Sequence, residues 1–169
     1  MRADARRNRE LIVRAAIKVF TTAGECVSME DIARAAGLGV GTLYRHFPDR
    51  AALLALISCD VVSRLTAGLE AAPADLPRWD VLLDYVRAAV LEPFAMLKAV
   101  PIEDPVVAQP VARLHEALHQ VIKGAQDEGS LRADVEPAAV IELLSLVVCR
   151  PGASAEDALA KVVLAGLRA

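Results

Sequence analysis

Apolar positions recur at helical spacing from the start of the chain. The first stripe follows the i, i+3, i+4, i+7 pattern of one buried helix face and comprises Ile12, Ala15, Ala16, Val19, Phe20 and Ala23. Gly24 follows this stripe, where a left-handed C-cap belongs. We therefore expect a first helix at about residues 5–23.

Two short helices are predicted next. Ser28 and Asp31 form the pattern of an N-cap with its capping-box acid, and Gly37 stops this second helix. A third helix is expected at about residues 40–46, with Leu43 facing inward.

The rest of the chain also has helical periodicity. From Arg50 an apolar stripe runs to the break at Pro73 and Pro77, which predicts a long helix linking the two halves. Further helices are expected at about residues 78–98, 106–128, 137–149 and 154–168. Because we find no strand-like alternation and no internal repeat, the predicted fold is all-α with about nine helices.

Composition and charge refine this picture. Apolar residues make up 55 % of the 169 positions and aromatic residues 4 %, with 32 alanines and 22 leucines, which argues against an all-β sandwich or barrel. Residues 1–50 hold nine Lys/Arg and six Asp/Glu, whereas residues 51–169 hold ten and sixteen. A basic module on an acidic body suggests that one end meets a polyanion, although a difference of this size also arises by chance.

Membrane and secretion signals are not evident in the sequence. No apolar run approaches the roughly 18 residues of a membrane span, and Glu142 breaks the richest stretch, residues 138–149. Arg14 and Lys18 interrupt the first apolar segment, so it does not resemble a signal peptide, and a cytoplasmic location is expected. The three cysteines fit neither a metal-ligand spacing nor an even disulfide set and are Cys26, Cys59 and Cys149.

The second and third helices have the proportions of a helix-turn-helix. Small Ala33 lies where the helices would cross, Gly37 lies in the turn, and Ile32, Leu38 and Leu43 form the seam. This geometry holds the later helix out from the body, where it fits a major groove about 12 Å wide. Helical hairpins of this kind also occur as mere packing.

A longer string of residues resembles a known family. Residues 8–54 resemble the N-terminal DNA-binding domain of TetR-family transcriptional repressors, through the segments AA...F...G, SMEDIARAAGL and GTLYRHFPDRAALL, and GSLRADVEPAAV resembles a later stretch of the family. The resemblance implies a helix-turn-helix head at 1–47 and a ligand-binding, dimerising helical body at 48–169. The chain departs from the family at Gly39, where a hydroxyl residue is usual, and in its short body, which favours a small ligand cavity or none.

The resemblance and side-chain chemistry together suggest the DNA contacts. Tyr44 and His46 would donate to phosphates, and Arg45 would pair with a guanine or settle on a phosphate. Arg50 begins a helix, whose free amides favour an anion, so a phosphate contact is expected as in the family. The expected set is Ser28, Gly39, Val40, Gly41, Thr42, Tyr44, Arg45, His46, Arg50, Arg6 and Arg7.

Several of these residues have a purely structural interpretation. Tyr44 can pack on the first helix and His46 can cap the third. Arg6, Arg7 and Arg9 are expected to precede the first helix as a basic arm that follows the DNA backbone or enters the minor groove, but they are equally compatible with a solvated helix start.

The last two predicted helices, 137–149 and 154–168, suggest a homodimer. The earlier one is apolar on nearly all sides and must be covered all round, plausibly by a second copy in a four-helix interface. Such a dimer would read double-stranded DNA at a near-palindromic operator, and a charge at Leu144 or Val163 should yield monomers. The alternative is a central core helix of a monomer.

A small, mostly apolar effector is expected inside the body, between the helix that begins at Arg50 and the helix at 137–149. The few large side chains in this part of the chain stand among many alanines and valines, and such packing could leave a cavity. Nearby polar side chains could orient a ligand in it. The candidates are Trp79, Tyr85, Phe94, Met96, Gln109, Arg113, His115 and His119. Plain core and surface roles explain these eight residues equally well.

The sequence offers no catalytic constellation, and we expect neither an enzyme nor a cofactor. His115 and His119 share a helix face at i, i+4, but no third metal ligand is placed, so no metal site is expected. Two other functions stay open: a ligand-independent DNA-binding regulator, and a small-molecule-binding helical protein whose helix-turn-helix is only packing.

Overall fold

The structure is a computed structural model that describes residues 2–23, 27–92, 100 and 104–169. In these residues it contains no strand, and the prediction of an all-α fold is confirmed. Eight helices are described where about nine were expected. They are α1 (Arg2–Ala23), α2 (Met29–Ala35), α3 (Val40–His46), α4 (Arg50–Glu70), α5 (Arg78–Ala89), α7 (Pro105–Asp127), α8 (Pro137–Val148) and α9 (Ala158–Leu167).

Helix boundaries differ from the sequence prediction mainly at three ends. Helix α1 already begins at Arg2, so the basic residues expected as an arm ahead of it lie inside the helix, and the arm prediction is wrong. Helix α5 ends at Ala89 rather than near residue 98. Helix α9 begins at Ala158 because the Asp157 carboxylate accepts a hydrogen bond from the Ala160 amide, 2.9 Å away, and so caps the helix there.

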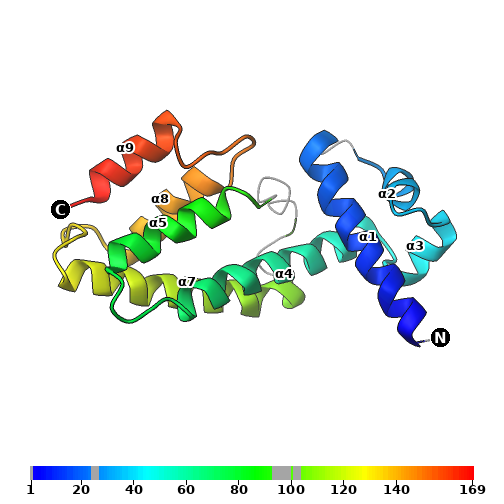
Figure 1. Cartoon of the computed structure of the whole chain (residues 1–169), viewed down its shortest axis with the longest axis horizontal. Coiled ribbons are helices and arrows are strands. Elements are labelled where there is room, and N and C mark those ends of the chain that lie inside the picture. The colour runs from blue at the N-terminus through cyan, green and yellow to red at the C-terminus, as the bar shows by residue number, and fades with distance from the viewer. Residues whose placement is uncertain (1, 24–26, 93–99, 101–103) are drawn as a thin grey trace.

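Helices α1, α2 and α3 form one end of the molecule, around a small apolar core (Figure 1). Ile12 of α1, Ile32 of α2 and Leu43 of α3 are fully buried in it, together with Phe47, which follows α3. Asp49 caps the start of α4 by accepting a hydrogen bond from the Ala52 amide at 2.8 Å. The long helix α4 therefore starts beside this core and runs on into the other end of the molecule.

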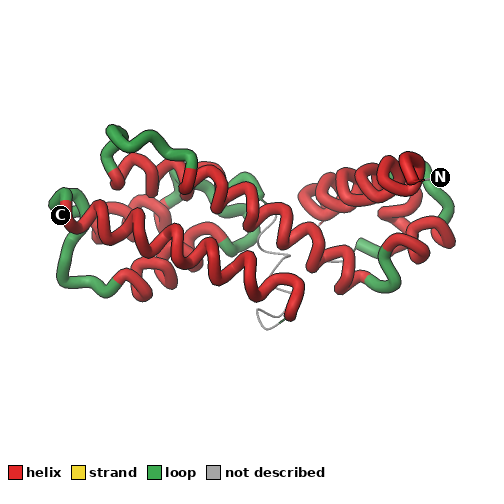
Figure 2. The backbone as a smooth tube through the Cα atoms, turned by 90° about the horizontal axis from the view of Figure 1, so that it is seen from below, coloured by secondary structure: helices red, strands yellow, loops and turns green. Residues whose placement is uncertain are grey.

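At the other end, α4 packs along α7, and α5 and α8 pack against α7 in turn (Figures 1 and 2). Helix α4 is also long and apolar enough to cross a membrane by length and composition, which the sequence analysis did not expect. However, 56 % of its most apolar window is buried inside the molecule. A core helix of a soluble protein passes the same test, so this finding is weak evidence for a membrane span.

A proline inside α7 is accommodated by a contact from α4. Pro110 has no N–H, so the Val106 carbonyl one turn earlier lacks its helical donor. The Cys59 thiol of α4 donates to that carbonyl, with 2.9 Å between sulfur and oxygen. Burial raises the pKa of Cys59 and keeps the thiol protonated as a donor. The contact joins α4 and α7 near the start of α7.

Candidate nucleic-acid interface

The start of α2 is fixed by the capping box predicted from the sequence. The Asp31 amide donates to the Ser28 hydroxyl oxygen at 3.1 Å, and the Ser28 amide donates to the Asp31 carboxylate at 3.2 Å. The Ser28 hydroxyl also donates to that carboxylate at 2.6 Å, and these hydrogen bonds lower the pKa of Asp31. The hydroxyl of Ser28 is therefore engaged in holding the start of α2.

The turn between α2 and α3 is a Schellman motif. Gly37 has a φ of 68°, a backbone conformation that a residue with a Cβ rarely adopts. Its amide donates to the Arg34 carbonyl at 3.1 Å, and the Leu38 amide donates to the Ala33 carbonyl at 2.9 Å. This closed turn sets the direction in which α3 leaves α2.

Helix α3 leaves most of its surface uncovered. Among its seven residues only Leu43 is buried, whereas Val40, Gly41, Tyr44 and Arg45 are exposed and two more are half-buried. Tyr44 is 43 % exposed. At Gly39, the N-cap, no side chain bonds the helix start, and an added Cβ at Gly39 or Gly41 would meet no atom within 4 Å.

The side chain of Arg45 lies back along its own helix. Its Nε donates to the Gly41 carbonyl at 3.1 Å and its Nη2 donates to the Thr42 hydroxyl at 3.3 Å. These bonds are exposed and can exchange for a base or a phosphate. The half-buried residues Thr42 and His46 flank this face.

Two arginines pack on aromatic rings at the edge of the head core. The Arg50 guanidinium lies 5.0 Å from the Phe20 ring centroid and donates to the Val27 carbonyl, so it ties the start of α4 to the segment before α2. The Arg9 guanidinium lies 4.9 Å from the Phe47 ring centroid. Sequence reasoning missed both contacts, since each joins residues more than twenty positions apart. Arg6 pairs with Glu10 at 3.2 Å on the surface of α1, and Arg7 is exposed there.

The residues expected to bind an effector do not converge on one cavity. Trp79 is buried and borders a groove between α5 and α9, whereas Tyr85 is buried and borders a groove between α4 and α5. Burial raises the pKa of Tyr85. His115 and His119 are exposed on α7. The candidates at positions 94 and 96, Phe94 and Met96, lie outside the described residues.

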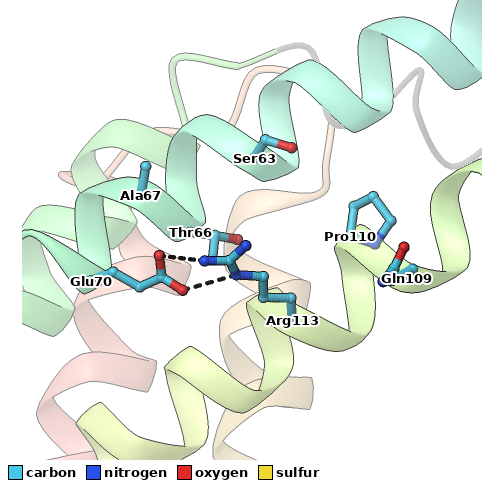
Figure 3. A pocket seen from close by; sticks show the side chains of 7 residues that line it. All are labelled: Ser63, Thr66, Ala67, Glu70, Gln109, Pro110 and Arg113. Atoms are coloured by element: carbon cyan, nitrogen blue, oxygen red, sulfur yellow. Dashed lines mark hydrogen bonds and ion pairs between the residues drawn. The ribbon is translucent and has the colours of Figure 1, made fainter.

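The remaining two candidates, Gln109 and Arg113, line an open groove between α4 and α7 (Figure 3). Its volume is about 350 Å³, and Ser63, Thr66 and Glu70 of α4 form the facing wall. Arg113 donates to both carboxylate oxygens of Glu70 at 2.9 Å, which joins the two helices across the groove. No group of three His, Cys, Asp or Glu side chains able to hold a metal gathers in the described part of the chain.

Helices α8 and α9 expose large apolar side chains. Leu146 of α8 is 59 % exposed, and Val162 and Leu159 of α9 are 70 % and 41 % exposed. The opposite face of α8 is covered by the body, where Val140, Leu144 and Val147 are buried. The other side of α8, which carries Leu146 one turn from Glu142, is open to solvent in the single chain.

Comparisons with known proteins agree with this architecture. Residues 12–57 match the family model of bacterial regulatory proteins of the tetR family, and residues 80–169 match the C-terminal domain of SbtR-like transcriptional regulators. HTH-type transcriptional regulators of Staphylococcus aureus are 50 % identical over 54 residues, which is 31 % of this chain and 29 % of theirs. The chain thus spans less than a third of the length of these curated relatives.

Solved structures match nearly the whole chain. A TetR transcriptional regulator from Streptomyces coelicolor is 30 % identical, with 95 % of this chain and 98 % of that chain covered and a TM-score of 0.67. A TetR regulatory protein from Mycobacterium vanbaalenii is also 30 % identical, with 99 % of both chains covered and a TM-score of 0.66. The chain belongs to the TetR family and is a DNA-binding transcriptional regulator.

Proposed function

We propose that this protein is a cytoplasmic transcriptional repressor that binds a near-palindromic operator as a homodimer and releases it when a small effector binds. The main support is α3, which buries Leu43 alone and presents the rest of its surface outward. In this proposal residues 1–47 form the DNA-binding head and residues 48–169 form the body that senses the effector and dimerises.

The proposed contacts divide by chemistry. Tyr44 and His46 donate to phosphates from the end of α3, whereas Thr42 and Arg45, with Val40 beside them, reach base edges. Gly39 and Gly41 let the DNA backbone approach closely, because no atom of the described residues lies within 4 Å of where a Cβ would stand at either position. Ser28 and Arg50 already form hydrogen bonds within the protein that position the starts of α2 and α4. In this proposal each side chain also contacts a phosphate.

Salt dependence distinguishes these roles. We expect Arg45→Gln to lower operator affinity. If Arg45 contacts a base, the variant should also change the preference between DNA sequences by about 1–3 kcal/mol. If Arg45 contacts a phosphate, the slope of log affinity against log salt concentration should instead fall by about one unit. Tyr44→Phe removes only the hydroxyl and should weaken binding to all DNA sequences by the same factor. The measurement is fluorescence anisotropy with DNA selected from a random pool, at several salt concentrations.

The matched control is Lys123→Gln, which removes an exposed cation from α7 in the body. Its affinity and salt slope should equal those of the parent protein. If both α3 variants also behave like the parent, the helix-turn-helix is only packing, and the protein does not bind DNA through this face.

The groove between α4 and α7 is the effector site we favour, because α4 continues into the DNA-binding head. Its lining by Thr66, Glu70, Gln109 and Arg113 suits an effector with polar groups better than the mostly apolar one expected from the sequence. An effector that separates Glu70 from Arg113 would shift α4 against α7 and change the spacing of the two recognition helices. The effector can change DNA affinity only as far as it binds the shifted arrangement of α4 more tightly than the arrangement that binds DNA.

The Glu70–Arg113 pair allows a test without the effector. Arg113→Glu and Glu70→Arg should each change operator affinity by up to about fivefold, since an exposed pair contributes no more than about 1 kcal/mol. The double variant restores opposite charges and should recover the parent affinity.

Arg87→Glu, which breaks the exposed Arg87–Asp84 pair within α5, is the control and should leave operator affinity unchanged. Unchanged affinity in both single variants at Glu70 and Arg113 would favour a ligand-independent regulator. The readout is operator binding by anisotropy at one fixed salt concentration.

A further inference from the structure

The groove between α5 and α9 lies away from α3 and from the α4–α7 groove (Figure 1). One stripe of each helix borders it: Trp79, Leu83 and Val86 at i, i+4, i+7 on α5, and Leu164, Ala165 and Arg168 along the α9 side. Its volume is about 430 Å³, larger than that of the α4–α7 groove. The α9 side chains that border it differ from the exposed apolar residues Leu159 and Val162, so the groove is compatible with dimerisation through those residues.

The walls of this groove are apolar. Val86 is buried, Leu83 and Leu164 are half-buried, and Trp79 is 5 % exposed. The Trp79 Nε1 is buried and has no hydrogen-bond partner among the described residues. Walls of this composition favour a hydrocarbon body, whose burial releases water from apolar surface.

The rim of the groove is cationic. Arg87, Lys161 and Arg168 border it, against one carboxylate, Glu156. Arg87 is paired with Asp84 at 3.0 Å, and Lys161 lies 3.8 Å from Glu156. The Arg168 guanidinium lies 5.7 Å from the Trp79 ring centroid and, within the described part of the chain, forms no ion pair. One guanidinium is therefore left without a carboxylate beside an apolar groove.

The backbone around Arg168 is fixed in place. The Arg132 amide donates to the Leu167 carbonyl at 3.0 Å, and the Ala169 amide donates to the Ser130 carbonyl at 3.3 Å. These bonds hold the end of α9 against the segment that follows α7. The backbone that carries Arg168 is therefore held at this end of the groove.

We propose that the α5–α9 groove binds an aliphatic carboxylate. The hydrocarbon chain lies between Trp79 and Leu164, and the carboxylate accepts two hydrogen bonds from the Arg168 guanidinium, whose planar fork matches two oxygens. This site is independent of DNA binding and of the effector proposed for the α4–α7 groove.

Fluorescence of Trp79 gives a direct readout, because it is the only tryptophan in the chain. We expect titration of the full chain with decanoate, below its micelle concentration, to give a saturable fluorescence change and one site per chain by calorimetry. Decanol has the same chain length without the charge and should bind at least about tenfold more weakly than decanoate. Non-saturable signals or equal affinity for decanol would overturn the proposal.

Two variants test the placement of the ligand. Arg168→Gln should lower decanoate affinity about tenfold by removing the charge-assisted hydrogen bonds, and Ala165→Phe should abolish binding by filling the groove while leaving Arg168 in place. Lys123→Gln, outside the groove, should bind as the parent does. Circular dichroism establishes that each variant is folded, and unchanged decanoate affinity in either groove variant contradicts the site.

Discussion

Val162→Glu is expected to convert a dimer into monomers and to lower operator affinity at least about 100-fold, because specific dimer sites bind far more tightly than non-specific contacts. Val162 is 70 % exposed in the single chain, and Leu146 on the adjoining helix α8 is 59 % exposed. In a four-helix interface both would be buried against the partner, where an unpaired carboxylate costs several kcal/mol. Leu146→Glu should have the same effect, and light scattering at micromolar concentration measures it.

The structure also corrects the choice of position for this experiment. Leu144, which the sequence suggested, is 1 % exposed and lies in the core of its own chain, so a charge there should unfold the body rather than separate two copies. Val106→Glu is the control, because Val106 is an exposed apolar residue on α7. Dimers that persist in both Val162→Glu and Leu146→Glu would contradict the proposed interface.

Leu43→Ala is expected to destabilise the head by about 2–5 kcal/mol, as other large-to-small changes in cores do. Leu43 is fully buried and is the only residue by which α3 inserts into the core between α1 and α2. Without it, α3 loses its fixed orientation, and operator binding should be lost even where the body remains folded. Thermal unfolding and hydrogen exchange of the α3 amides measure the change.

Val40→Ala on the same helix is the matched control. Val40 is exposed, so its truncation should alter stability by no more than about 0.5 kcal/mol. A similar loss of stability in the two variants would show that α3 is held by contacts other than Leu43.

The head could be predicted closely because its signals are local. The capping pair Ser28 and Asp31 and the left-handed Gly37 each act on backbone groups within a few residues. The contacts of Arg50 with Val27 and of Arg9 with Phe47 were missed, because they join distant segments that only folding brings together.

The sequence by itself determined the helices, their order and the family, since helical periodicity, caps and breakers are local properties of the chain. Only the tertiary structure decided which face of each helix is covered. It buried Trp79 and Tyr85, exposed His115 and His119, and brought Gln109 and Arg113 opposite Glu70 on α4. An apolar stripe shows that a helix must pack against something. Which neighbour it packs against depends on how the helices rotate and cross, and contacts between distant segments determine that arrangement.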